Sequence, residues 1–198
     1  MDRPKLVLLD RDGVLNEDSD AYIKSPAELH VYARAPDAVA RLTLAGIKVA
    51  VVSNQSVVGR ALIPLADLDT IHAALTERLG SRGAVIDALL FAPDHPDRPT
   101  ERRKPGPGML LEAMARFGIA AADSVMVGDQ PTDAEAARRA GVPFILVRTG
   151  KGRATEAMLT PGAARAVVDD VAAAVDLILG GASAPAARPP KLRAPKAP

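Results

Sequence analysis

The chain has 198 residues, 48% of them hydrophobic, which is enough for one domain with a substantial core and excludes disorder throughout. The formal net charge is +1, but four basic residues among the last 17 residues contribute to it without any acidic residue, so residues 1–181 carry a net charge of −3 and make a poor nucleic-acid binder. The absence of cysteine excludes disulfides and thiolate metal sites, and no apolar run reaches the length of a signal peptide or membrane span, so we expect a cytoplasmic protein.

Short runs rich in Val, Ile and Leu alternate with Ala- and Leu-rich stretches of helical period, a pattern typical of a parallel sheet covered by helices. We therefore predict a Rossmann-like, three-layer α/β/α sandwich with a mainly parallel central sheet. In chain order, we expect a strand over 5–9, a helix over 37–45, a strand over 47–52, a helix over 65–79, a strand over 84–91, a helix over 108–117, a strand over 124–127, a helix over 132–140, a strand over 143–147, a short strand over 166–168 and a helix over 170–179.

The composition changes at Ala182. The sequence that follows, ASAPAARPPKLRAPKAP, is rich in proline and basic residues and has almost nothing to bury. We therefore predict a single domain over 1–181 and a disordered tail over 182–198.

Polar segments follow four of the predicted strands. DRDG at 10–13 follows the first strand, SNQS at 53–56 the second, RRKP at 102–105 comes after the third by a long loop, and GD at 128–129 ends the fourth. Ligands of doubly wound sheets bind outside the carboxyl ends of the strands. We therefore expect these four segments to converge at one edge of the sheet.

Each segment also has an ordinary structural explanation. Acidic residues in a DxDG segment are common in turns, a Ser-Asn pair can end a strand, and Lys104 can be a solvated loop charge. Asp129 and Asp133, on either side of Pro131, can cap a helix. Their shared position after predicted strands favours a functional site.

This set of residues suits phosphoryl transfer. A carboxylate that attacks phosphorus brings its own negative charge to an anionic substrate, and a divalent cation and an ammonium group can offset that charge. We therefore expect Asp10 to be the nucleophile, Asp10 and Asp129 to bind Mg²⁺, and Lys104 to bridge nucleophile and phosphate. The hydroxyl of Ser53 and the backbone N–H of Asn54 are expected to donate to the phosphoryl oxygens.

Asp12 is the candidate proton donor. It lies two residues after Asp10, so in an extended segment both side chains project to the same side. We expect Asp12 to protonate the leaving group and then to activate water, with Asp10 ionised beside the cation and Lys104 and with Asp12 holding the proton. The intervening Arg11 is expected to point away from that side.

The segments DRDGVLN, VVSNQS, RRKPGPGML and VGDQPTDAEAA resemble, in order and spacing, the four motifs of the haloacid dehalogenase superfamily of aspartyl phosphatases. Over about residues 5–180 the sequence is similar to the branch of heptose bisphosphate phosphatases, which is related to histidinol-phosphate phosphatases. The resemblance implies Mg²⁺-dependent hydrolysis of a small sugar phosphate, here the 7-phosphate of D-glycero-D-manno-heptose 1,7-bisphosphate on the route to bacterial surface polysaccharide. It also implies loops near Tyr22 and Arg60 over the sugar in place of a large cap domain.

The resemblance assigns roles to individual residues. Mg²⁺ would be held by the carboxylates of Asp10 and Asp129 and by the main-chain carbonyl of Asp12, while Asp133 would support the site without binding the metal directly. The residues expected to stabilise the phosphoryl group or line the substrate pocket are Ser53, Lys104, Asn54, Gln55, Ser56, Arg103 and Gln130.

The sequence departs from this branch in two places. Many relatives carry a zinc-binding Cys/His loop before the Arg-Lys-Pro segment, but residues 91–105 contain only His95, so no structural zinc is expected. Gln130 stands where relatives often have Lys, and residues 57–59 replace a Gly-rich turn. These changes leave histidinol phosphate, or several sugar phosphates, as alternative substrates.

A catalytically silent protein that binds a phosphorylated metabolite is the alternative of another class. Asp12 beside Asp10 argues against it, since a binder has no use for a proton donor next to a nucleophile. We expect a monomer without nucleic-acid or membrane partners. His30 and His72 are expected at the surface or an interface rather than in catalysis.

Overall fold

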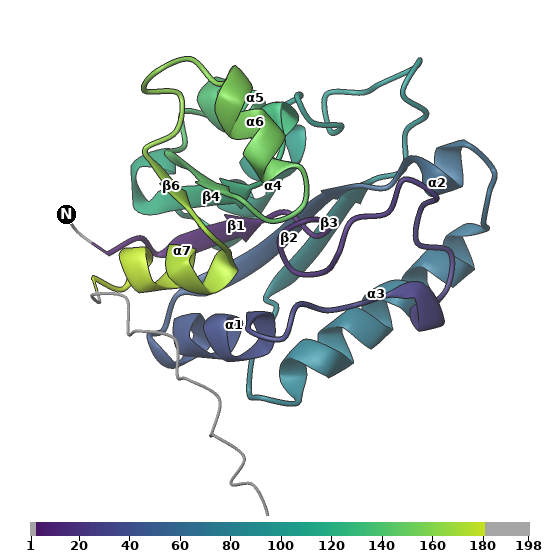
Figure 1. Ribbon diagram of the computed structural model, residues 1–198, viewed down its shortest axis with the longest axis horizontal. Helices are drawn as coiled ribbons and strands as arrows, with labels where there is room; N and C mark the ends of the chain where they lie inside the picture. Colours follow the sequence, from purple (N-terminus) through teal and green to yellow (C-terminus); the bar gives the residue numbers. More distant parts are fainter. Residues whose placement is uncertain (1–2, 181–198) are drawn as a thin grey trace, which may run out of the picture.

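The computed structural model describes residues 3–180, and these form a six-stranded sheet between two layers of helices (Figure 1). All neighbouring strands are parallel, in the order β3-β2-β1-β4-β5-β6. The predicted three-layer α/β/α sandwich is confirmed. The strands are β1 (Leu6–Leu9), β2 (Lys48–Asn54), β3 (Ala88–Ala92), β4 (Ser124–Gly128), β5 (Phe144–Val147) and β6 (Ala166–Val168).

Helices cover both faces of the sheet (Figure 1). One face packs against α1 (Ala35–Leu44), α3 (Leu65–Gly80) and α7 (Val171–Ile178), and the other against α4 (Gly108–Phe117) and α5 (Pro131–Ala140). The short elements are α2 (Ser56–Gly59), α6 (Gly152–Met158) and the 3₁₀ turns η1 (Pro26–Glu28) and η2 (Ala121–Asp123). No helix among residues 3–180 is long and apolar enough to cross a membrane.

β1 lies in the middle of the sheet, which explains its unbroken apolar run. Successive side chains of a strand point to opposite faces. Val7 and Leu9 pack into the core under α1, α3 and α7, whereas Leu6 and Leu8 pack into the core under α4 and α5. All four side chains are fully buried, as expected for a parallel strand covered on both faces.

Two groups of elements differ from the sequence prediction. β3 begins at Ala88 rather than at residue 84, because the carboxylate of Asp87 accepts the backbone N–H of Val49 and pairs with Lys48. The short helices α2 and α6 were not predicted, since each spans less than two turns or has little apolar periodicity. The predicted tail over 182–198 lies outside the described residues, so the division into domain and tail stays a prediction.

The register of the central strands places two carboxylates side by side. Leu9 of β1 pairs with Val127 of β4, and the N–H of Asp10 donates to the carbonyl of Val127 at 3.0 Å. Asp10 therefore leaves β1 at the level where Asp129 follows β4. Pairing of β1 with β4 therefore brings together two residues that lie more than a hundred positions apart in the chain.

Candidate active site

A cavity of about 300 Å³ opens at the edge of the sheet where β1, β2 and β4 end. Three of the four polar segments singled out in the sequence contribute side chains to it. The fourth, residues 128–129, does not line the cavity itself, but Gln130, which follows it, does. The lining residues are Asp10, Arg11, Asp12, Asp18, Ser19, Asp20, Tyr22, Ile23, Ser53, Asn54, Gln55, Ser56, Arg103, Lys104, Gln130, Thr132 and Lys151.

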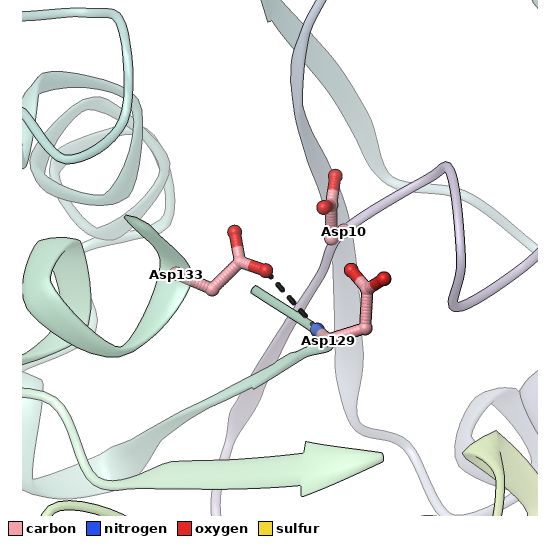
Figure 2. A group of neighbouring side chains, drawn as sticks. All are labelled: Asp10, Asp129 and Asp133. Atoms are coloured by element: carbon pink, nitrogen blue, oxygen red, sulfur yellow. Dashed lines mark hydrogen bonds between the residues drawn. The ribbon is translucent and has the colours of Figure 1, made fainter. Parts of the chain in front are cut away.

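Three carboxylates converge at the base of this site. Figure 2 shows Asp10 after β1, Asp129 after β4 and Asp133 in the first turn of α5. One oxygen of each lies within 4.8 Å of the others, and all three residues are buried. A single cation can contact oxygens at such separations.

Lys104 supplies the positive charge at this cluster. Its Nζ lies 2.9 Å from Oδ1 of Asp10 and 2.7 Å from Oδ1 of Asp133. Burial alone would lower the pKa of Lys104, but the charges of Asp10 and Asp133 raise it above its usual value. The side-chain amide of Asn54 holds this loop, donating to the carbonyl of Lys104 at 2.9 Å and accepting its N–H at 3.0 Å.

Asp133 fixes the start of α5 in addition to pairing with Lys104. Its Oδ2 accepts the backbone N–H groups of Asp129 at 3.1 Å and Gln130 at 3.0 Å, the first of which is drawn in Figure 2. With Gln130 as the residue before the helix, this is a capping box. The helix capping anticipated as a structural explanation is therefore present for Asp133, with Gln130 rather than Asp129 as its partner, and it holds the backbone of Asp129 in place.

The two carboxylate oxygens of Asp129 differ in their hydrogen bonding. Oδ2 accepts the backbone N–H of Lys151 at 2.7 Å, whereas Oδ1 is buried and finds no hydrogen-bond partner among residues 3–180. A Cβ atom at Gly13 or Gly150 would overlap the carboxylate, so only glycine leaves it room. An unpartnered buried oxygen in a tight cradle is a feature that a cation ligand explains.

The charges of the site fit a divalent cation. Among residues 3–180, the cationic groups in direct contact with the carboxylates of Asp10, Asp12, Asp129 and Asp133 are those of Arg11 and Lys104, which leaves two negative charges when all four are ionised. Oxygen ligands of this kind suit Mg²⁺.

Burial, with a smaller contribution from the neighbouring carboxylates, raises the pKa values of two of these acids. Burial, followed by the charge of Asp133, raises the pKa of Asp129 to about 7. Burial also raises the pKa of Asp10 well above its usual value, although Lys104 opposes the shift. A bound cation favours the ionised carboxylates, so the same cluster would deprotonate when it binds metal.

Asp12 lies in an environment unlike that of Asp10. Burial would raise the pKa of Asp12, but the charge of Arg11 and hydrogen bonds from Asn16, Arg11 and Gln55 outweigh it and lower the pKa. The expected order, with Asp10 the stronger acid, is therefore reversed among the protein's own groups. The prediction for Arg11 was also wrong, because its side chain turns back onto the carboxylate of Asp12 instead of pointing away.

The remaining predicted residues also lie at the cavity. Ser53 is buried, with Oγ 2.7 Å from Nε2 of Gln55, and Ser56 lines the wall at the start of α2. Arg103 is half-buried, and its Nη1 donates to the carbonyl of Asp94 at 3.4 Å. The side chain of Gln130 both caps α5 and faces the cavity.

The sequence interpretation missed part of the cavity wall. Lys151 follows β5, and its Nζ lies 3.3 Å from Asp18 and 3.5 Å from Asp20 across the mouth. The rule that ligands bind at the carboxyl ends of strands, applied to β5 as it was to the other strands, would have found Lys151.

One histidine prediction was wrong. His30 is exposed, but His72 is buried in α3, with its ring 5.2 Å from that of Phe91, and burial lowers its pKa to about 4. The signal for this was present, because His72 falls on the apolar face that Leu68 and Leu75 define.

Comparisons with known proteins agree on one family. Residues 101–174 match the family model of HAD-hydrolase-like proteins. The chain is 40% identical over 175 residues to the D-glycero-beta-D-manno-heptose-1,7-bisphosphate 7-phosphatase of Bordetella bronchiseptica, covering 88% of this chain and 98% of that one. It is 39% identical to the Pseudomonas aeruginosa enzyme of the same name, covering 88% and 97%.

A solved structure extends this likeness to three dimensions. The crystal structure of D,D-heptose 1,7-bisphosphate phosphatase from B. bronchiseptica, complexed with magnesium and phosphate, superposes with a TM-score of 0.85 at 41% identity. The alignment covers 89% of this chain and 98% of that chain.

Proposed function

The chain belongs to the heptose-1,7-bisphosphate 7-phosphatase family of HAD-like hydrolases, and from this premise we propose that it hydrolyses the 7-phosphate of D-glycero-D-manno-heptose 1,7-bisphosphate. It is a phosphatase, a phosphoric monoester hydrolase, as its relatives are. The observation that carries the proposal is the buried cluster of Asp10, Asp129 and Asp133 with Lys104 paired to Asp10, in a chain that matches these enzymes over 88% of its length.

Asp10 is the nucleophile of this proposal. A carboxylate oxygen of Asp10 forms a bond to phosphorus while the bond from phosphorus to the sugar oxygen breaks, giving an aspartyl-phosphate. Asp12 gives its proton to the departing sugar oxygen, then takes a proton from the water that hydrolyses the aspartyl-phosphate. Lys104, 2.9 Å from Asp10, is placed to neutralise charge on the nucleophile and on the transferred group.

Magnesium is the cofactor that fits this donor set. When bound, Mg²⁺ supplies positive charge that offsets the nucleophile and the phosphoryl oxygens. The carboxylates of Asp10 and Asp129 and the main-chain carbonyl of Asp12 would hold it, and Asp133 would keep its contacts with Lys104 and with the start of α5. The unpartnered Oδ1 of Asp129 supports this assignment.

The substrate assignment uses the rest of the cavity wall. Ser53 and the backbone of Asn54 would donate to the phosphoryl oxygens, while Gln55, Ser56, Arg103 and Gln130 would face the sugar. Both the nitrogen and the oxygen of the Asn54 side-chain amide contact the backbone of Lys104, so this residue would act on the phosphoryl group through its backbone. The net charge of −3 on residues 1–181 supports our proposal that the protein has no nucleic-acid partner, and we keep the proposal of a cytoplasmic monomer.

Phosphate release from p-nitrophenyl phosphate tests the reaction class. We expect turnover that requires Mg²⁺ and is abolished in Asp10→Asn, which keeps the shape of the side chain but removes the nucleophilic oxygen. Mg²⁺-independent turnover, or turnover by Asp10→Asn at the wild-type rate, would contradict the mechanism. Absence of turnover together with tight phosphate binding would favour a silent binder.

Specificity constants test the substrate. The two anomers of the heptose bisphosphate, fructose 1,6-bisphosphate and histidinol phosphate should be compared under one set of conditions. We expect the highest kcat/KM for one of the heptose anomers. A clear preference for histidinol phosphate, or similar values for all four compounds, would replace the substrate and leave the mechanism unchanged.

A further inference from the structure

The guanidinium group of Arg11 is buried with a single acidic partner. Its side chain is 1% exposed, and its Nε and Nη2 donate to the carboxylate of Asp12 at 2.8–3.0 Å. Nη1 finds no hydrogen-bond partner among residues 3–180. Burying an arginine is costly, and here the contacts that offset the cost all go to one carboxylate next to the nucleophile.

Two more side chains hold the same carboxylate. Nδ2 of Asn16 lies 2.8 Å from Oδ1 of Asp12, and Nε2 of Gln55 lies 2.8 Å from Oδ2. The same Nε2 is 2.7 Å from Oγ of Ser53, at the end of β2. Three side chains, those of Arg11, Asn16 and Gln55, therefore hold the carboxylate of Asp12. The amide of Gln55 also links this carboxylate to the hydroxyl of Ser53, which we propose contacts the phosphoryl group.

We propose that Arg11 is a positioning residue, which aims Asp12 at the leaving-group oxygen and stabilises the carboxylate that remains after proton transfer. The inference rests on the proposed function. When the bond from phosphorus to the sugar oxygen breaks, the proton of Asp12 moves to that oxygen, and the resulting carboxylate faces the fork of Arg11. The fork provides two parallel donors in a fixed plane, which a lysine does not.

The leaving group separates this role from a structural one. A sugar alkoxide needs a proton in order to depart, whereas p-nitrophenolate leaves without one, so only the first reaction depends on an aimed acid. An arginine that merely supports the fold would affect both substrates equally. The ratio of the rates for the sugar phosphate and for p-nitrophenyl phosphate therefore measures how well Asp12 is positioned for proton transfer.

The test uses Arg11→Met and Arg11→Lys with Mg²⁺ in single-turnover quench experiments. We expect formation of the aspartyl-phosphate from heptose 1,7-bisphosphate to fall at least about 100-fold more in Arg11→Met than formation from p-nitrophenyl phosphate falls. Arg11→Lys keeps the charge without the fork and should show the same selectivity with a smaller loss. Arg41→Met is the matched control, because Arg41 also pairs with an aspartate, Asp176 at 2.6 Å, but between α1 and α7, outside the cavity lining.

Each outcome decides the question. Equal losses for the two substrates, unchanged rates, or failure of both Arg11 variants to fold would overturn the role of Arg11 and leave the proposed function standing. A wild-type protein without Mg²⁺-dependent release from either substrate would defeat both proposals. Rate ratios that change in the Arg11 variants but not in Arg41→Met would support the inference.

Discussion

Lys104 and Asp10 form a buried ion pair, with 2.9 Å between Nζ and Oδ1 and side chains only 2% and 7% exposed. The two residues are 94 positions apart in the chain, yet the loop after β3 brings Lys104 to the end of β1. Because Lys104 also pairs with Asp133, one ammonium group serves two carboxylates of the cluster. The stability of the cluster and the proposed chemistry both depend on this group.

Replacing Lys104 with methionine should damage folding and activity together. Removal of one partner of a buried pair leaves uncompensated charge, so we expect the free energy of unfolding to fall by about 3–5 kcal/mol. Phosphate release should fall at least about 100-fold with the loss of charge stabilisation. Urea unfolding and initial rates measure the two effects. Arg102→Met is the control, because the partly exposed Arg102 pairs with Glu112, away from the cavity, and equal effects of both variants would contradict this role of Lys104.

The carboxylate of Asp129 should make stability depend on pH in an identifiable direction. Its pKa rises from 3.8 to about 7 in the folded protein, so the folded state binds the proton more tightly than the unfolded chain. The contribution is present at low pH and is lost as pH rises from about 4 to about 7, by at most about 4 kcal/mol.

Comparison with Asp129→Asn isolates this effect. In EDTA-treated protein, the variant should gain stability relative to wild type as pH rises through that window, and Mg²⁺ should restore the wild type at high pH because it binds the ionised form. His72, with a pKa lowered to about 4, acts in the opposite direction but is common to both proteins. A constant difference between the two unfolding free energies across pH would refute the assignment.

Alanine at Gly150 should impair metal binding beyond its effect on the backbone. Gly150 and Gly46 both have positive φ, +56° and +71°, so alanine at either position should cost roughly 1–2 kcal/mol. Only at Gly150 would the new Cβ overlap the carboxylate of Asp129, whereas nothing lies within 4 Å at Gly46. We expect the Mg²⁺ concentration for half-maximal activity to rise about tenfold or more in Gly150→Ala alone. Identical Mg²⁺ titrations of the two variants would show that Asp129 had not moved.

Asp12→Asn should slow turnover more than it weakens phosphate binding. The amide keeps the size of the side chain but has no acidic proton to transfer to a sugar oxygen, so kcat should fall about 100-fold or more. Inhibition by inorganic phosphate measures binding in the same assay. If kcat and the affinity for phosphate decline to the same extent, Asp12 acts in binding and not in proton transfer.

The sequence predicted the core of the fold because its signals are local. The apolar run of β1 and the helical periodicity of α3, α4 and α5 each lie within one short segment of sequence. These elements begin and end close to their predicted bounds. The start of β3 was not predictable in this way, since it depends on Asp87 reaching the backbone of Val49, nearly forty residues away. The burial of His72 was predictable, because His72 lies on the apolar face of α3 with Leu68 and Leu75, but this pattern was overlooked.

The sequence by itself determined which chemical groups meet. Parallel strands end at the same edge of a sheet, so the carboxylates that directly follow β1 and β4 had to approach one another, and the loop after β3 starts from the same edge. Only the tertiary structure decided which group touches which: that Lys104 joins Asp10 to Asp133, that Arg11 turns onto Asp12, and that one oxygen of Asp129 is left unpartnered. The succession of strands and helices along the chain follows from periodicity. Side-chain contacts depend on register, rotamers and the burial that distant segments impose, and these arise only when the layers pack.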